Sequence, residues 1–207
     1  MKVNLGCGLS VVDGWINIDG SPTVKLQKLI GVGIIFRAVL KPTFPSVVVY
    51  GDVTTGLKLA NESVDILYSS HMLEHLSLTD LKCALVEIKR VLKPGGVFRS
   101  VLPDFEVCIK EYLASNDEGA STQFLQKTML GIEKRPKGLL ANLRNLFGNA
   151  NHLWMWDYKG IKQQLELAGF CEISRAGFND SEIADFSEVE DIKRWEKCLG
   201  FECVNPQ

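Results

Sequence analysis

The sequence lacks the features that mark several common functional classes. Its six cysteines are scattered without any C-x-x-C spacing, which argues against a zinc site and against a small disulfide framework. A formal net charge of -2 gives no basic excess of the kind that attracts proteins to phosphate backbones. The first expected strand starts at Lys2, which leaves no room for a signal peptide. We therefore expect a cytoplasmic protein with reduced thiols, no bound metal and no nucleic acid as its main partner.

No apolar run is long enough to cross a membrane. The most hydrophobic window, LIGVGIIFRAVL at 29–40, is interrupted by Arg37 and falls short of the ~20 apolar residues that a bilayer requires. The cations Lys25, Lys28 and Lys41 around this window would permit an amphipathic helix in peripheral contact with a membrane surface. A segment that covers the sheet or the ligand is the simpler interpretation.

What the sequence does contain is an alternation of strand and helix patterns. Near-continuous apolar runs at 46–52 and 63–70 are typical of parallel strands buried on both faces. A helix is predicted over 78–92, with Ser77 as its cap and a Pro-Gly-Gly sequence after its end. Further strands and helices follow in alternation, which predicts an α/β fold, a Rossmann-like doubly wound and mostly parallel sheet, in a single domain over 1–207.

The stretch at about 105–150 is less regular than the rest of the chain. It begins with the helical pattern FEVCIKEYL and, after a polar break, resumes with the amphipathic pattern GLLANLRNLF at 138–147. A small basic run, Lys134, Arg135 and Lys137, precedes the second pattern. An insertion of this length between core elements suggests a lid or a substrate-binding segment.

The beginning of the chain poses a topological question. A first strand runs into Gly6-Cys7-Gly8, and a second strand ends on Asp19 only a few residues later. Parallel strands normally need a crossover of about a dozen residues or more, usually a helix. A hairpin would place Asp19 at the wrong end of the sheet, so the sequence predicts a shortened right-handed crossover with one helical turn at Leu9 to Val12.

The ordered motifs carry a resemblance that none of them carries alone. They are NLGCG, GWINIDGS, GDV, SVDILYSSHMLEHL, EIKRVLKPGGVFRSVLPD and HLWMWDYKGIKQQLELAGF. In this order they resemble the class I S-adenosylmethionine-dependent methyltransferases, in particular a small single-domain family often linked to surface-polysaccharide biosynthesis. The resemblance covers most of the chain and implies S-adenosyl-L-methionine as cofactor and an antiparallel last strand. Asn4 and Ser10 depart from the glycine-rich pattern of the class, where an acid and a glycine stand.

The resemblance also implies a cofactor site at the carboxyl ends of the strands. Asp19 would accept hydrogen bonds from the ribose hydroxyls, as an acid does in dinucleotide folds, and Asp52 would accept from the adenine amino group. The glycine turn would approach the methionine portion, and the end of the fourth strand would line the methyl-donor side. The complete expected set is Asn4, Gly6, Cys7, Gly8, Asp19, Asp52, Val53, Ser69, Ser70 and His71.

The expected reaction is methyl transfer to an oxygen or nitrogen of a small-molecule or saccharide acceptor. A hydroxyl acceptor needs a general base, and histidine is the usual base near neutral pH. His71, at a strand end, and His152, directly after the insertion, are the candidate catalytic residues. A role for His152 as a cap or hinge of the lid is an equal alternative.

Two other functions stay open at the level of sequence. Tyr158 and Lys162 form a Y-x-x-x-K pair that resembles the catalytic pair of short-chain NAD(P)-dependent oxidoreductases, although the wider glycine spacing of those enzymes is missing. The short crossover also suits a degenerate domain that binds a ligand without catalysis. Nothing in the sequence specifies an oligomeric state.

Overall fold

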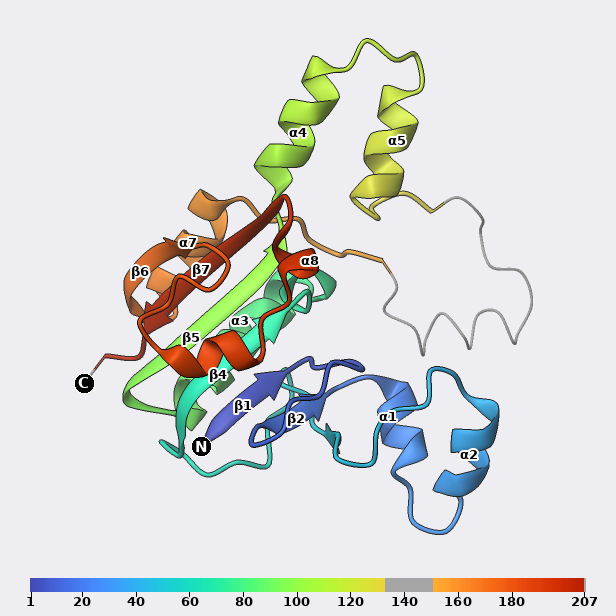
Figure 1. Ribbon diagram of the computed structural model, residues 1–207, viewed down its shortest axis with the longest axis vertical. Coiled ribbons are helices and arrows are strands. Elements are labelled where there is room, and N and C mark those ends of the chain that lie inside the picture. Colours follow the sequence, from blue (N-terminus) through green and yellow to red (C-terminus); the bar gives the residue numbers. More distant parts are fainter. Residues whose placement is uncertain (133–150, 207) are drawn as a thin grey trace.

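The computed structural model describes residues 1–132 and 151–206 and contains one seven-stranded sheet. The strand order is β3-β2-β1-β4-β5-β7-β6, and helices flank the sheet (Figure 1). The strands are β1 (Lys2–Leu5), β2 (Ile16–Asp19), β3 (Val49–Tyr50), β4 (Val64–Ser70), β5 (Leu92–Pro103), β6 (Cys171–Ala176) and β7 (Cys198–Val204). The helices are α1 (Pro22–Gln27), α2 (Gly33–Val39), α3 (Leu78–Val91), α4 (Phe105–Ala114), α5 (Ala120–Lys127), α7 (Tyr158–Leu167) and α8 (Ile192–Trp195), with 3-10 turns η1 (Leu73–His75) and η2 (Ala184–Glu188).

The pairing of the strands confirms the predicted fold class. Strands β3, β2, β1, β4 and β5 are parallel to their neighbours, whereas β7 runs antiparallel to both β5 and β6. This is a Rossmann-like, mostly parallel sheet with an antiparallel C-terminal pair. Its parallel strands all end at one edge, where ligands bind in open α/β sheets.

Helix α3 shows how the sequence pattern builds the core. Ser77 Oγ accepts a hydrogen bond from the Asp80 backbone amide, which confirms the predicted cap. The apolar stripe of the helix, with Leu81, Leu85 and Ile88, is fully buried in the largest hydrophobic cluster. This packing fixes the start of α3, and with it Asp80, beside the ends of the strands.

Two buried asparagines explain how the first crossover can be so short. β1 and β2 are parallel, with Asn4 paired to Asn17 in register. Asn4 Nδ2 donates to the Ser10 carbonyl at 2.8 Å, and Asn17 bonds both the amide and the carbonyl of Val12, at 3.0 and 2.9 Å. Side-chain amides thus satisfy loop groups that a helix would otherwise pair. The shortened crossover is confirmed. The expected helical turn at Leu9 to Val12 is wrong, because this loop is held by hydrogen bonds to the asparagine side chains and forms no helix.

The first part of the expected insertion is a helical hairpin. Helices α4 and α5 project away from the carboxyl end of β5 (Figure 1). Asp104 caps α4 by accepting from the amides of Glu106 and Val107, and an ion pair between Glu111 and Lys127 joins the two helices. The expected amphipathic pattern at 138–147 and the preceding basic run lie outside the described residues.

The hydrophobic window at 29–40 does not cover the sheet. It forms α2 and the loop before it, and Ile30 and Ile34 are 101% and 78% exposed. The simpler interpretation of this segment is therefore wrong for these side chains. Within residues 1–132 and 151–206, every helix is too short or too polar to cross a bilayer.

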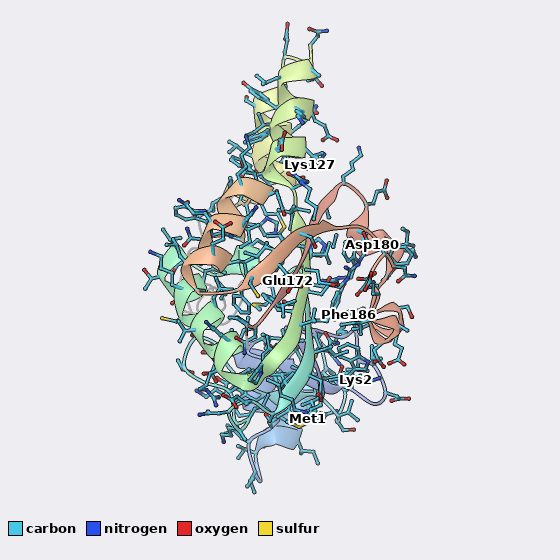
Figure 2. The ribbon with its side chains drawn as sticks, turned by 90° about the vertical axis from the view of Figure 1, so that its left-hand side faces the viewer. Met1, Lys2, Lys127, Glu172, Asp180 and Phe186 are labelled. Atoms are coloured by element: carbon cyan, nitrogen blue, oxygen red, sulfur yellow. The ribbon has the colours of Figure 1, made fainter. Side chains whose placement is uncertain are left out.

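A buried arginine holds the segment between β6 and β7 against the sheet. Arg99 of β5 makes ion pairs with Glu190, Asp180 and Glu202 at 2.5, 2.8 and 3.0 Å. Figure 2 shows Asp180 and Phe186 on this segment, and Lys2 of β1 makes further ion pairs to it. The same segment carries α8 and Arg194 to the ends of the parallel strands.

Candidate active site

A cavity of about 690 Å³ lies where β1, β2, β3 and β4 end. Its volume falls within the range of about 300–1,000 Å³ that is typical of small-molecule sites. Seven of the residues expected from the sequence line it together: Gly6, Cys7, Gly8, Asp19, Asp52, Val53 and His71. The strand ends therefore bring this part of the predicted site to one place.

Asp19 links the glycine turn to the second strand. Its carboxylate is almost buried, and it accepts from the Gly8 amide at 2.9 Å and from the Ser21 amide at 2.8 Å. A carboxylate offers about four lone-pair positions, so two positions are left for hydroxyl donors in the cavity. The carboxylate is thus fixed in place by the backbone and still able to accept hydrogen bonds from a ligand.

The glycine turn keeps the cavity open because its backbone takes a conformation that suits glycine. Gly6 and Gly8 have φ angles of +68° and +55°. A Cβ on Gly6 would lie 2.6 Å from Met72 Cγ, whereas a Cβ on Gly8 would meet no protein atom within 4 Å. Gly6 therefore serves packing, and Gly8 leaves free space for a ligand next to the backbone.

Asp52 closes the third strand in the same manner as Asp19 closes the second. Its Oδ1 accepts from the amide and the hydroxyl of Thr54, at 2.9 and 2.7 Å. Within the described part of the chain, Oδ2 makes no hydrogen bond, so one carboxylate oxygen can serve a ligand. Between the two acids, Cys7 is a neutral thiol, since burial and the nearby Asp19 raise its pKa to about 12.

His71 lines the cavity, but hydrogen-bond acceptors face both of its ring nitrogens. Nε2 lies 2.9 Å from the Arg194 carbonyl, and Nδ1 lies 3.3 Å from Glu74 Oε1. Burial disfavours the charged ring, but the Cys198 thiol, the Glu74 carboxylate and the Arg194 carbonyl outweigh burial and raise the pKa of His71 to about 10. Both ring nitrogens of His71 thus face protein acceptors, an arrangement that favours the protonated ring.

Three other expected residues do not line the cavity. Asn4 is buried beneath the crossover, and Ser69 is completely buried in β4. Ser70 instead holds Arg194, whose Nε and Nη2 donate to its hydroxyl and carbonyl at 2.6 and 2.9 Å. Arg194 itself lines the cavity. No local sequence pattern indicates this residue, because it follows Ser70 by 124 positions.

His152, the second catalytic candidate, lies behind the cavity wall. It is 9% exposed and lies with Nε2 3.9 Å from Glu74 Oε1, while the next residue, Leu153, lines the cavity. Burial lowers the pKa of His152, and the proximity of His75 lowers it further, against the opposing attraction of Glu74. His152 is therefore a neutral, largely enclosed ring next to the acceptor end and not an open base.

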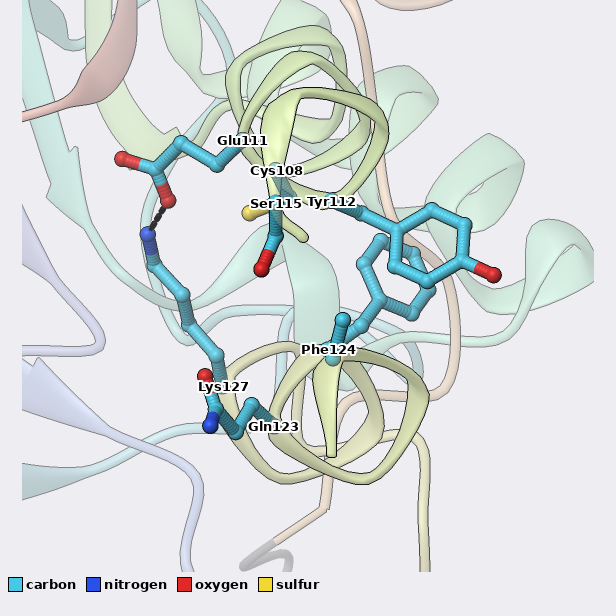
Figure 3. Close-up of a pocket in the computed structure, with 8 residues that line it drawn as sticks. Cys108, Glu111, Tyr112, Ser115, Gln123, Phe124 and Lys127 are labelled. Carbon is cyan, nitrogen blue, oxygen red and sulfur yellow. Dashed lines mark hydrogen bonds and ion pairs between the residues drawn. The ribbon is translucent and has the colours of Figure 1, made fainter. Parts of the chain in front are cut away.

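A second, smaller cavity lies between α4 and α5. Figure 3 shows Tyr112 beside Phe124, with ring centroids 5.5 Å apart, and the ion pair of Glu111 and Lys127 across the two helices. The cavity measures about 80 Å³, well below the usual size of a ligand site. It is a packing gap of the hairpin.

Comparison with known families matches residues 4–100 to a family model described as a methyltransferase domain. This part of the chain is similar to a methyltransferase domain. The match spans the glycine turn, both acids and β4, which are the elements that form the large cavity. No curated protein sequence matches the chain.

Solved structures support the same fold. A S-adenosylmethionine-dependent methyltransferase of Thermotoga maritima, described as a possible histamine N-methyltransferase, has a TM-score of 0.53 at 17% identity, over 99% of this chain and 81% of that one. A methyltransferase of Archaeoglobus fulgidus has a TM-score of 0.50 at 16% identity, over 98% and 85% of the two chains. A phosphoethanolamine N-methyltransferase of Haemonchus contortus in complex with S-adenosyl-L-methionine has a TM-score of 0.50 at 13% identity, over 100% of this chain but 48% of that one.

The family match over residues 4–100 and the fold shared with solved S-adenosylmethionine-dependent methyltransferases point in the same direction. The cavity fits S-adenosyl-L-methionine, since free backbone space at Gly8 adjoins the partly unpaired carboxylates of Asp19 and Asp52. The oxidoreductase alternative is not supported. Tyr158 donates to the Ile173 carbonyl and Lys162 pairs with Glu166, and neither residue lines the cavity.

Proposed function

We propose that this protein is an S-adenosylmethionine-dependent methyltransferase that transfers a methyl group to an oxygen or nitrogen of a small-molecule or saccharide acceptor. The observation that carries the proposal is the extent of the cavity beyond the expected cofactor residues. On the β4 side it is lined by His71, Met72, His75, Leu76, Asp80, Leu153 and Arg194. This mixture of apolar and hydrogen-bonding side chains suits a small polar acceptor better than a hydrocarbon.

The cofactor end of the proposal follows from the fixed acids. Asp19 would accept from the ribose hydroxyls through its remaining lone pairs, and Asp52 would accept from the adenine amino group, with Val53 beside it. The turn of Gly6, Cys7 and Gly8 would adjoin the methionine portion. In this proposal Asn4 and Ser70 do not contact the cofactor. Asn4 positions the crossover, and Ser70 positions Arg194.

The chemistry asks mainly for alignment of donor and acceptor in a site that excludes water. When bound, S-adenosyl-L-methionine supplies an electrophilic methyl group on a sulfonium. The acceptor heteroatom would form a bond to the methyl carbon as the carbon–sulfur bond breaks, which would leave S-adenosylhomocysteine, and the proton of the acceptor would pass to solvent water. We place His71 at the acceptor end of the cavity and His152 behind its wall, and the protein contacts of both rings do not suit removal of the acceptor's proton by a free base.

The remaining expectations enter the proposal as supporting features. The insertion at about 105–150, whose described part is the α4–α5 hairpin, would serve as a lid or acceptor contact. All six cysteines are free, which agrees with the reducing conditions of a cytoplasmic location. Surface-polysaccharide biosynthesis is one process in which a saccharide acceptor would arise.

An isotope-transfer assay tests the acceptor class. Protein and methyl-labelled S-adenosyl-L-methionine are incubated with separate pools of sugars, nucleotide sugars, small amines and phenols, and the labelled product is located by mass spectrometry. The proposal predicts label on oxygen or nitrogen in at least one pool. Label on carbon alone would refute the acceptor class, and an absence of transfer despite tight cofactor binding would favour a binding domain without catalysis.

A further inference from the structure

The three histidines of the chain converge on one buried carboxylate. Glu74 of η1 is completely buried, and within the described residues neither of its carboxylate oxygens makes a hydrogen bond. A buried carboxylate that receives no hydrogen bond is unfavourable, and each such group in a native protein calls for a partner such as a water or an ion. His71 and His152 lie near Glu74 at ion-pair distance only, 3.3 and 3.9 Å from Oε1.

The backbone holds this cluster together from two parts of the chain. The amides of Leu153 and Trp154 donate to the Glu74 carbonyl at 2.8 and 3.2 Å, which places His152 over the carboxylate. Glu74 and His75 are neighbours in η1, and the rings of His75 and His152 meet edge to face with centroids 5.1 Å apart. One ligand atom from each of Glu74, His75 and His152 lies within 4.8 Å of the others.

A hydrogen bond beside the cluster orients the His75 ring as a ligand, whereas Nδ1 of His152 is buried without a partner among the described residues. His75 Nδ1 lies 3.1 Å from the Asn151 carbonyl, so this nitrogen carries the proton and Nε2 keeps its lone pair. In metal sites, the ring nitrogen of a ligand histidine that does not bind the metal usually donates to a backbone carbonyl or a carboxylate in this way. His71 supplies a comparable outer contact to the carboxylate through Nδ1.

We propose that Glu74, His75 and His152 form a binding site for a divalent transition metal ion, contrary to the expectation from the sequence that none is bound. Two imidazoles and one carboxylate are the ligand set of catalytic sites that keep a coordination position open. Ligand bonds of about 2.0–2.1 Å require donors about 3.3 Å apart, so side-chain movements of up to about 1.5 Å from the present separations would close the site.

The position of the site indicates its use. His75 lines the large cavity, whereas Glu74 and His152 lie behind its wall. The open coordination position would therefore face the acceptor end and take a hydroxyl or other oxygen of the acceptor. This use, unlike metal binding itself, rests on the proposed function.

A titration with cobalt(II) tests the site directly. The metal-free full-length protein is titrated with Co²⁺ and followed by calorimetry and by visible absorption, in the wild type, Glu74→Gln, His152→Ala and, as a matched control, Glu166→Gln on the exposed face of α7. Circular dichroism confirms that each variant is folded. Because loss of an outer-shell partner alone weakens metal binding 10–100-fold, we expect one site per chain and at least about 100-fold weaker binding in the first two variants only.

The outcomes separate the two proposals. Binding unchanged in folded His152→Ala, or a thiolate-to-cobalt charge-transfer band from cysteine ligands, would overturn the metal site. S-adenosylhomocysteine is titrated into the same variants in parallel. Loss of cobalt binding with intact S-adenosylhomocysteine binding supports the assignment, whereas absence of S-adenosylhomocysteine binding in a wild type that binds cobalt would refute the proposed function and leave the metal site standing.

A second surface, independent of the cavity, has the composition of a membrane contact. We define the basic window as residues 20–51, which include Lys25, Lys28, Arg37 and Lys41 but no acidic residue. On this window the apolar side chains Leu29, Ile30, Val32, Ile34, Ile35 and Val39 are 44–101% exposed. Exposed apolar residues surrounded by basic residues, with no acidic residue among them, are typical of segments that bind an anionic lipid surface.

We infer that the basic window docks on anionic lipid, with Ile30 and Ile34 inserted at the interface. Neighbouring cations near such a surface each contribute roughly a fivefold factor to partitioning. A symmetric contact of this window with the same window of a second copy is disfavoured, because it would bring like charges together.

Sedimentation with vesicles tests this contact. The protein is mixed with phosphatidylcholine vesicles with and without about one quarter phosphatidylserine, using wild type, Ile34→Asp and the control Val86→Asp on α3, where the valine is 64% exposed. We expect binding only to the anionic vesicles, weakened by salt and by Ile34→Asp but not by Val86→Asp. Equal binding to neutral vesicles, no binding at all, or self-association that Ile34→Asp abolishes would overturn the inference.

Discussion

Replacement of Arg99 by methionine is predicted to destabilise the protein more than any single exposed ion pair could explain. The guanidinium is 1% exposed and pairs with Glu190, which is 0% exposed, as well as with Asp180 and Glu202 at 51% and 24% exposure. It also lies 4.9 Å over the ring of Trp195, the last residue of α8. Arg99 thus joins β5 to the segment that carries α8.

The solvent exposure of the ion-pair partners of Arg99 determines how much stability the substitution removes. In Arg99→Met, Asp180 and Glu202 regain water, whereas the Glu190 carboxylate stays buried without its cation. Removal of one partner from a buried ion pair costs about 3–5 kcal/mol, which in a chain of this size lowers the melting temperature by roughly 6–20 °C. Asp180→Asn removes only a half-exposed partner and should cost less than about 1 kcal/mol.

Chemical denaturation of both variants, followed by circular dichroism, measures the difference. The double variant Arg99→Met with Glu190→Gln should recover part of the loss, because the buried charge is then removed as well. If Arg99→Met costs no more than Asp180→Asn, the buried pair does not stabilise the C-terminal segment and this reasoning fails.

Three further variants test separate parts of the structure. Gly8→Ala should cost about 1–2 kcal/mol of stability from its left-handed backbone and weaken S-adenosylhomocysteine binding more strongly, as comparison of a thermal melt with a titration will show; unchanged binding would mean that the turn does not adjoin the cofactor. The hydrogen bond from Arg90 lowers the pKa of Glu87 below 4.5, so the unfolding free energy of the wild type should exceed that of Glu87→Gln by about 1 kcal/mol at neutral pH. This difference should disappear as pH falls through the lowered pKa. A constant difference down to acid pH would contradict the ion pair. Tyr158→Phe combined with Lys162→Ala should leave methyl transfer and cofactor binding unchanged, and a loss of either would reopen the oxidoreductase reading.

Much of the cofactor half of the site was predictable because its signals are local. A glycine turn after one strand and an acid at the end of the next lie close together in sequence, and the topology of parallel strands brings them to one edge. The length of β3 was not predictable in the same way. The run at 46–52 predicts a full strand, but only Val49–Tyr50 pairs with β2, since hydrophobic composition does not report how many residues find a partner.

The acceptor half depends on long-range contacts that no local pattern encodes. Arg194 reaches the cavity only because Arg99 and Ser70 hold its segment against the sheet. The cluster at Glu74 has one local component, the Glu-His pair in HMLEHL, and one distant component, His152. From the sequence, His71 and His152 are two separate candidate bases, because the convergence of the histidines on one carboxylate is visible only in three dimensions.

The central claim is that Asp19 forms part of an S-adenosylmethionine site, and calorimetric titration with S-adenosylhomocysteine tests it most directly. The wild type, Asp19→Asn and the control Asp13→Asn, an exposed acid in the same crossover, are compared after circular dichroism has shown that all three are folded. We predict stoichiometric binding to the wild type and to Asp13→Asn, and at least about tenfold weaker binding, or 1.4 kcal/mol, for Asp19→Asn. Equal affinity in all three proteins, or no binding to the wild type, would contradict the account.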